Sequence, residues 1–327
     1  MAGPPPAVAA TRLAVRAHLG GLGPQTLVLA ACSGGVDSLA LAAALAFEAE
    51  HHGVRGGALV VDHALQPGSK DIADTAAAVC RSLGLDPVEV LAVRVEPGAG
   101  GGPEAKARAA RYAALEAAAE RLGSPLVLLG HTQDDQAEQV LLGLARGSGA
   151  RSLGGMPVRR GRFARPFLGL GRRDTAAVCT AYGLRPWQDP HNADRSYARV
   201  RARQALDHLE ADLGPGLTEA LARSAALLRD DAELLDTLAA QARGRLGRGP
   251  VDVLALRELP GAVRRRVLRL LAVEAGALPG SLSSGHLRDV DALVNDWHGQ
   301  GPVDLPGRVV AARRGTALSM SRAEAVR

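Results

Sequence analysis

The chain has 327 residues, enough for two ordinary domains, and its 47% hydrophobic and 22% charged residues are normal for a folded globular protein and exclude wholesale disorder. Its longest clean apolar run, residues 39–47, is too short for a membrane helix of about 18 residues. The net charge of +5 is uneven: residues 146–210 hold 13 arginines against five acids, a local +8, which favours a surface that faces RNA or DNA.

The cysteines and the N-terminus bear on the cellular compartment. Cys32, Cys80 and Cys179 are far apart and form no C-x-x-C pair, which argues against a disulfide framework or a zinc site. The N-terminus has no basic segment ahead of an apolar core, so we expect no secretory signal. These features predict a cytoplasmic protein with no membrane association.

Short apolar segments alternate with longer Ala-rich segments over about the first 130 residues. We predict buried strands at residues 25–32, 57–62, 88–95 and 126–129. We predict intervening helices at residues 38–50, 69–83 and 104–122. This alternation is typical of βαβ units, so it predicts an α/β fold with a Rossmann-like parallel sheet covered on both faces. Such sheets bind ligands beyond the carboxyl ends of their strands.

The second half of the chain has a different pattern. From residue 197 onward it is mainly helical, with predicted helices at residues 217–243 and 260–276 and a short β segment within 302–320. We therefore predict a catalytic domain at residues 1–210 and a smaller, mainly helical C-terminal domain at residues 211–327.

The string Ser33-Gly-Gly-Val-Asp-Ser38 follows the first strand and opens the first helix. Its glycines permit a tight turn, and the helix N-terminus and two hydroxyls offer donors, so the string predicts a phosphate-binding loop. A Ser-Gly turn that caps a helix is the alternative. Asp37 would be repelled by phosphates unless a divalent cation lies between them. The string resembles the PP-loop of the N-type ATP pyrophosphatases, which cleave ATP between the α- and β-phosphates and adenylate a substrate.

Polar residues follow two further strands. Asp62 and His63 end the second strand, where they border the nucleotide or merely cap the loop. After the fourth strand, Thr132 and Asp135 make a capping box. Together, the three acids Asp134, Asp135 and Glu138 exceed what capping requires. Asp135 and Glu138 could hold a cationic amino group, and Asp134 could face a metal.

For two groups of residues, an ordinary structural role is an alternative to a functional one. One shares a helix face at spacings of three and four, which a solvated ion-pair stripe would also show: Glu104, Arg108, Arg111 and Tyr112. The other consists of five aromatics in the arginine-rich stretch, which could stack on unpaired RNA bases or pack in the core: Phe163, Phe167, Tyr182, Trp187 and Tyr197.

Taken in order, these segments resemble the bacterial tRNA(Ile)-lysidine synthases over about residues 25–210, and more faintly over residues 251–320. The family's R-N-x-I-R motif reads Arg199-Val-Arg201-Ala-Arg203 here, without an amide at Val200. The resemblance implies that ATP adenylates the C2 oxygen of the wobble cytidine of a CAU-anticodon isoleucine tRNA. The ε-amine of free lysine then displaces AMP to give lysidine, which switches codon reading from AUG to AUA.

The resemblance also implies cofactors, partners and residue roles. ATP and Mg²⁺ are the implied cofactors, and a homodimer is one expected oligomeric state. The implied catalytic residues are Asp37, Arg111 and Asp135. The implied ATP-binding residues are Ser33, Gly34, Gly35, Val36, Asp37, Ser38, Asp62, His63 and His131. The implied lysine-binding residues are Asp135 and Glu138. The implied tRNA-binding residues are Arg199, Arg201 and Arg203. The implied metal ligands are Asp37 and Asp134.

Three other functions compete with this one. A tRNA thiolase would use the same adenylation chemistry, but the absence of paired cysteines argues against it. An NAD or GMP synthetase shares the loop but does not call for the arginine-aromatic stretch. A non-catalytic RNA-binding protein with a decayed nucleotide fold is disfavoured by the intact Ser33, Asp37, Ser38 and Asp135.

Overall fold

The computed structural model describes residues 3–62, 68–93, 103–147 and 149–323. Its contacts divide the chain into two compact units, one comprising Met1–Ser148 and Ser152–Ala226 and the other Gly149–Arg151 and Leu227–Arg327. The contacts therefore divide within helix α9 (Leu217–Arg245), whereas a domain boundary near residue 210 was expected from the sequence and stays a prediction.

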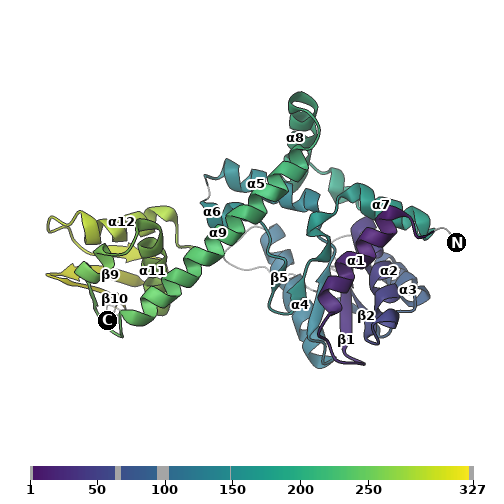
Figure 1. Cartoon of the computed structure of the whole chain (residues 1–327), viewed down its shortest axis with the longest axis horizontal. Coiled ribbons are helices and arrows are strands. Elements are labelled where there is room, and N and C mark those ends of the chain that lie inside the picture. The colour runs from purple at the N-terminus through teal and green to yellow at the C-terminus, as the bar shows by residue number, and fades with distance from the viewer. Residues whose placement is uncertain (1–2, 63–67, 94–102, 148, 324–327) are drawn as a thin grey trace. The chain divides into compact units, whose positions relative to one another are not determined.

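The first unit is built on a six-stranded sheet in the order β3-β2-β1-β4-β6-β5. Three of its strands, β1, β2 and β5, are labelled in Figure 1. All neighbours are parallel except the short edge pair β5–β6, so the predicted α/β fold with a parallel sheet is confirmed. The order reverses on either side of β1, which places a ligand crevice beyond the carboxyl ends of β1 and β4. The strands are β1 (Leu27–Cys32), β2 (Arg55–Asp62), β3 (Val88–Ala92), β4 (Leu126–Leu129), β5 (Arg159–Arg160) and β6 (Phe163–Ala164).

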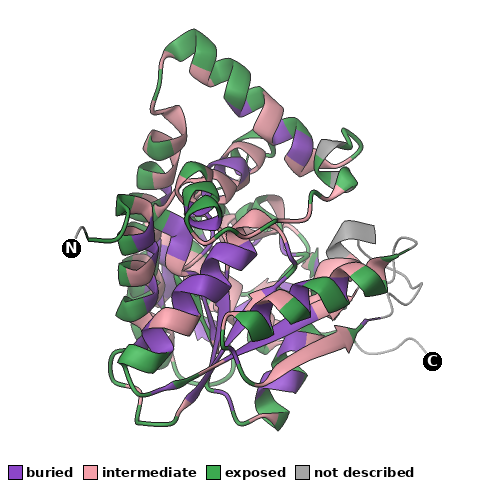
Figure 2. Ribbon diagram, turned by 90° about the vertical axis from the view of Figure 1, so that its right-hand side faces the viewer, coloured by how far each residue is buried: buried purple, intermediate pink, exposed green. Residues whose placement is uncertain are grey.

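Helices cover both faces of this sheet. Alternate residues of β1 point to opposite sides: Val28 and Ala30 pack in one core with α1, α2, α3 and α7, and Leu27 and Leu29 pack in a second core with α4. Figure 2 shows burial concentrated on the strands and on the inward faces of the helices. The helices are α1 (Pro6–Leu19), α2 (Val36–His51), α3 (Ser69–Ser82), α4 (Pro103–Arg121), α5 (Gln133–Ala145), α6 (Ala150–Leu153), α7 (Arg172–Ala181) and α8 (Ala198–Leu213), with short 3₁₀ turns at Pro166–Gly169 and Pro190–Ala193.

The second unit combines helices with a small antiparallel sheet in the order β7-β10-β9-β8. Its core joins the sheet residues Val309 and Ala311 to the helix residues Leu268 and Leu293. Its elements after α9 are β7 (Val251–Asp252), α10 (Val253–Arg257), α11 (Gly261–Glu274), α12 (Ser284–Asn295), β8 (Val303–Leu305), β9 (Val309–Arg314) and β10 (Ala317–Arg322). Throughout the described part of the chain, no helix combines the length and the apolar character that a membrane span requires.

Gly130, directly after β4, brings the end of this strand against the start of α2. A Cβ atom on Gly130 would lie 3.0 Å from the carbonyl oxygen of Asp37 and 3.2 Å from the backbone nitrogen of Ser38. The two segments that follow β1 and β4 therefore meet backbone to backbone.

Gly57 in β2 supports a prediction about stability. A Cβ atom there would lie 2.7 Å from the carbonyl oxygen of Pro87 and 2.8 Å from Leu29 Cδ2. Gly57→Ala should therefore lower the free energy of unfolding by about 1–3 kcal/mol, measured by thermal or urea unfolding. Gly20→Ala is the matched control, because nothing lies within 4 Å of its Cβ position. Equal stability of the two variants would contradict the predicted close packing.

Candidate active site

A cavity of about 860 Å³ lies beyond the carboxyl ends of β1, β2 and β4, within the first unit. It brings together most of the residues singled out in the sequence: Ser33, Gly35, Val36, Asp37, Ser38, Arg111, His131, Asp135, Glu138, Arg199 and Arg203. Among the ATP, metal and tRNA ligands that the resemblance implies, four described residues do not line it: Gly34, Asp62, Asp134 and Arg201. His63 lies outside the described residues, as does the side chain of Glu104.

The loop between β1 and α2 holds its own hydroxyls in place. Ser38 Oγ accepts a hydrogen bond from the backbone nitrogen of Ser33 (3.1 Å) and donates to the carbonyl oxygen of Gly35 (2.9 Å). No side chain caps α2, so a helix-capping function does not account for these serines. The N-terminus of α2 thus presents backbone N–H groups and its partial positive charge to the cavity, which is the arrangement that binds phosphate.

Two contacts fix this loop against its surroundings. The backbone nitrogen of Trp187 donates to the carbonyl oxygen of Gly34 (2.9 Å). Gly34 has φ = +81°, and a Cβ atom there would lie 3.2 Å from Ala76 Cβ of α3, so the turn requires glycine both for conformation and for space. Gly34 therefore shapes the loop from the side that packs on α3, not from the cavity.

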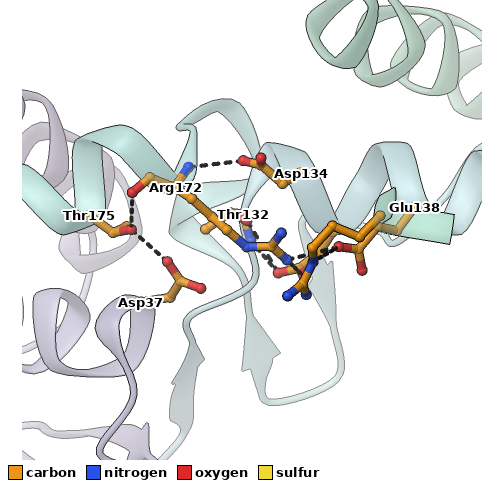
Figure 3. A network of polar contacts seen from close by, with 8 residues as sticks. Asp37, Thr132, Asp134, Glu138, Arg172 and Thr175 are labelled. Carbon is orange, nitrogen blue, oxygen red and sulfur yellow. Dashed lines mark hydrogen bonds and ion pairs between the residues drawn. The ribbon is translucent and has the colours of Figure 1, made fainter. Parts of the chain in front are cut away.

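Asp37 lies in the first turn of α2 and faces α7. Thr175 Oγ1 donates to Asp37 Oδ1 at 2.5 Å (Figure 3). Burial raises the pKa of the Asp37 carboxyl, and Asp135 and Asp134 add to the rise, whereas Thr175 and Arg172 oppose it. A cation beside Asp37 would relieve this unfavourable burial of negative charge.

The donor set fits a magnesium ion shared with a polyphosphate. Mg²⁺ is usually held by one or two carboxylates together with phosphate and water oxygens. Asp37 offers one oxygen to the cavity, and Asp134, which accepts from the backbone nitrogen of Arg172 (2.9 Å), lies close enough to influence its pKa. No group of three or more His, Cys, Asp or Glu side chains in the described chain could enclose a metal by itself. Any metal here would thus depend on the nucleotide for further ligands.

Asp135 and Glu138 of α5 already hold cationic groups, and these come from the chain itself. Arg172 Nη2 donates to Asp135 Oδ1 (2.9 Å) and to Glu138 Oε1 (3.0 Å), and Arg203 Nε donates to Glu138 Oε1 (2.8 Å). The carboxylates are well buried, with side chains 14% and 3% exposed. Figure 3 shows Arg172 reaching from α7 across towards Glu138. The site therefore balances two negative charges with two guanidinium groups.

Asp135 also performs the capping function predicted for it. Its Oδ2 accepts from the backbone nitrogen of Thr132 at 2.8 Å, so the predicted capping box is confirmed. Burial would raise the pKa of Asp135, but Arg172 and the Thr132 N–H group outweigh burial, and the pKa lies below its usual value. One carboxylate thus serves both the helix and the cavity.

Arg111 and His131 form a second polar group on the cavity wall. Burial lowers the pKa of His131 to about 3, with Arg165, Arg108 and Arg111 adding to the effect and Asp135 opposing it. The imidazole is therefore neutral at pH 7, and its Nδ1 is buried without a hydrogen-bond partner among the described residues. Such a neutral group can donate to or accept from a ligand without adding charge.

The helix face around Tyr112 is packed rather than solvated. Arg108 and Arg165 each donate to the Tyr112 hydroxyl (3.2 Å), and the Tyr112 ring packs edge-on against Phe163. A solvated ion-pair stripe therefore does not describe this face, which instead contributes Arg111 and Tyr112 to the cavity.

The basic motif of α8 is divided between the cavity and the surface. Arg199 and Arg203 line the cavity, together with the buried Val200 at the position where the family motif has asparagine. Arg201 is exposed and donates to the carbonyl oxygens of Arg195 (2.6 Å) and Ser196 (2.7 Å). The three arginines thus do not form a single surface.

The aromatics of the arginine-rich stretch divide in a similar way. Phe163 and Phe167 are buried in the core, and the Tyr182 hydroxyl accepts from Arg12 (2.7 Å). Trp187 and Tyr197 line the cavity, so these two are the candidates for stacking on a base.

Sequence reasoning missed Arg172 and Thr175, both in the first turn of α7. The available signals were Gly171 and Asp174, whose backbone-to-carboxylate bond (3.0 Å) marks the start of that helix, and the placement of two polar residues three apart on it. The arginines there had been interpreted only as a nucleic-acid surface.

Comparison with known proteins covers both parts of the chain. Residues 12–209 match the family model of the PP-loop domain, and residues 252–318 match that of the TilS substrate binding domain. A solved structure, the U34-tRNA thiolase NcsA from Methanococcus maripaludis with its [4Fe-4S] cluster, covers 68% of this chain and 80% of its own with a TM-score of 0.57. At 19% identity, this likeness shows the PP-loop fold alone.

Two much more similar relatives extend over nearly the whole chain. The tRNA(Ile)-lysidine synthase of Thermobifida fusca is 56% identical over 96% of this chain and 96% of its own. The tRNA(Ile)-lysidine synthase of Streptomyces coelicolor is 54% identical over 97% of this chain and 98% of its own. On this identity and coverage, the chain belongs to the tRNA(Ile)-lysidine synthase family of PP-loop proteins.

Proposed function

We propose that the protein uses ATP to join lysine to C2 of the wobble cytidine in a CAU-anticodon isoleucine tRNA. The products are lysidine, AMP and pyrophosphate, and the modified tRNA reads AUA instead of AUG. Within the site, the observation that carries the proposal is one cavity that contains both the glycine-serine loop at the uncapped start of α2 and two buried carboxylates, Asp135 and Glu138.

The loop side of the cavity suits the adenylation step. The N–H groups of Gly34 to Ser38 and the hydroxyls of Ser33 and Ser38 would bind the phosphates, and Arg111 would steady the α-phosphate. Asp62 and His63, at the end of β2, would border the nucleotide. Mg²⁺, held by Asp37 with Asp134 beside it, would offset negative charge on the departing pyrophosphate.

The acidic side suits the second substrate. Free lysine carries a carboxylate and two amino groups, and the cavity offers it both signs of charge, from Asp135 and Glu138 and from Arg172 and Arg203. The amino group that attacks must first lose its proton, and Asp135 and Glu138, which line the cavity, are placed to hold that group at the reacting carbon. Asp135 is therefore proposed as a catalytic as well as a binding residue.

The tRNA would contact the wall of the cavity and the surface around it. Arg199 and Arg201 at the start of α8 are proposed to contact phosphates, with Trp187 and Tyr197 available to stack on bases near the cavity. The second unit, which matches a substrate binding domain, is proposed to contact the tRNA as well. We propose a cytoplasmic enzyme, with a homodimer as one of the assemblies to be tested.

The competing thiolase function has weaker support. The thiolase resembles this chain at 19% identity, whereas relatives named lysidine synthase reach 54–56%. A non-catalytic RNA-binding function does not account for the intact loop hydrogen bonds of Ser33 and Ser38 or for Asp37 facing the cavity.

The reaction can be tested directly. A CAU-anticodon isoleucine tRNA transcript, incubated with protein, ATP, Mg²⁺ and lysine, should contain lysidine by nucleoside analysis, with AMP and pyrophosphate as co-products. Asp37→Asn should keep the fold, because only charge is removed, but lose at least 90% of the activity. ADP and orthophosphate as primary products would exclude the proposed cleavage of ATP.

The two steps should be separable at Glu138. Glu138→Gln removes one charge at nearly constant shape, so it should raise the KM for lysine about tenfold or more, while tRNA-dependent pyrophosphate release persists. Asp134→Asn, beside the proposed metal, should damage both steps. The control is Glu116→Gln, an exposed acid of α4 outside the cavity.

One result would reassign Glu138. If Glu138→Gln abolished pyrophosphate release and left the apparent lysine affinity unchanged, Glu138 would belong to the nucleotide site. The lysine site would then have to be sought around Glu104 and Arg108.

Binding of tRNA should depend strongly on salt, because each neutralised phosphate releases counterions. Replacing Arg199, Arg201 and Arg203 with Ala should make the dependence of the logarithm of the tRNA association constant on the logarithm of the salt concentration less steep. The exposed Arg201 alone should account for a change of about one in that slope, whereas Arg203→Ala should act mainly on the KM for lysine through Glu138. An unchanged slope in the triple variant would mean that the tRNA binds to another surface. The second unit would then be the first place to search for it.

A further inference from the structure

The first turn of α7 contacts all four acids of the site. Arg172 binds Asp135 and Glu138 through its guanidinium and Asp134 through its backbone nitrogen, and Thr175 binds Asp37 (Figure 3). None of these contacts was expected from the sequence. The Thr175 hydroxyl lies within hydrogen-bond distance both of a carbonyl group of its own helix and of Asp37 on the nucleotide side of the site.

We propose that Thr175 is a positioning residue for the ATP-dependent step: its hydroxyl holds one oxygen of Asp37 so that the other faces the cavity. The inference rests on the proposed function, because it is adenylation that requires Asp37 to meet a cation and phosphates.

The hydrogen-bond geometry supports this assignment over a purely helical one. A threonine hydroxyl in a helix commonly donates to a carbonyl of the preceding turn, and Thr175 Oγ1 lies 3.0 Å from the carbonyl oxygen of Arg172. Its distance to Asp37 Oδ1 is shorter, 2.5 Å, and a carboxylate is the stronger acceptor. The single hydroxyl hydrogen is therefore best directed to Asp37.

Asp37 also depends on this donor. Among the described residues, the Thr175 hydroxyl is the one group seen to donate a hydrogen bond to its carboxylate. Thr175 itself is fully buried, with 0% exposure, so water does not compete for the contact. Figure 3 shows one oxygen of Asp37 turned to Thr175 and the other turned away from it. Without the hydroxyl, the carboxylate would be free to rotate.

Thr175 is held by the packing of α7 on α2. Cys179, one turn further along α7, has its Sγ 3.4 Å from the carbonyl oxygen of Val36 at the start of α2. The two helices are thus in contact at the residue just before Asp37. This contact fixes where the Thr175 hydroxyl lies relative to the loop between β1 and α2.

The test compares three variants of α7. Thr175→Val removes the hydroxyl at nearly constant shape, and Thr175→Ser keeps it. Thr180→Val is the matched control, because the exposed Thr180 hydroxyl donates only to the carbonyl of Ala176 in the same helix. The readout is the affinity of the protein for Mn²⁺·ATP without tRNA or lysine, followed by the Mn²⁺ paramagnetic resonance signal.

We expect Thr175→Val to weaken Mn²⁺·ATP binding at least tenfold, and Thr175→Ser and Thr180→Val to stay within threefold of the unmodified protein. The KM for lysine should not change in Thr175→Ser. Unchanged Mn²⁺·ATP affinity in a folded Thr175→Val protein, or an equal loss in Thr175→Ser, would overturn the proposal. If Thr175→Val does not fold, Thr175→Ala against Thr175→Ser decides in the same way.

Failure of this inference and failure of the proposed function give different results. The binding measurement involves neither tRNA nor lysine. A protein that binds Mn²⁺·ATP in a Thr175-dependent manner but forms no lysidine would overturn the proposed function alone. Lysidine formation together with Thr175-independent binding would overturn only the role of Thr175.

Discussion

Buried carboxylates are stable only when cations or hydrogen-bond donors pair with them, and this constraint organises the cavity. Asp135 and Glu138 lie on α5, and their partners Arg172 and Arg203 come from α7 and α8, well apart along the chain. The ion pairs thus draw three helices around one point beyond the sheet. Residues proposed to bind substrate therefore also join the helices of this region to one another.

The same pairing limits what net charge can reveal. The +8 of residues 146–210 was interpreted as a surface for nucleic acid. In the structure, Arg172 and Arg203 neutralise acids of the cavity, and Arg165 binds the carbonyl oxygen of Pro157 and the Tyr112 hydroxyl. Arginines without such internal contacts are more available to phosphates, for example Arg201 at the exposed face of α8, where its guanidinium contacts backbone carbonyls. The net charge taken from the sequence counts all of these arginines alike, whatever they contact.

The parallel sheet and the loop could be predicted because their signals are local: apolar runs, Ala-rich helices and the Ser33–Ser38 string lie within short windows. The contact of Thr175 with Asp37 could not, because it joins residues 138 positions apart. Helix α1 was also not predicted, although Pro at its start is typical of a first turn. The division of the chain within α9 has no local signal either, because one continuous helix crosses it.

The close approach at Gly130 has a consequence for the dimensions of the site. Because the segments after β1 and β4 touch through main-chain atoms, the separation between the backbone at Asp37 and the backbone that leads into α5 is set by the thickness of two main chains. Rotation of side chains on the cavity wall cannot widen or narrow it. The hydrogen atom of a glycine therefore works as the spacer between the nucleotide loop and the acidic helix, and any larger group would act as a wedge that drives the two apart.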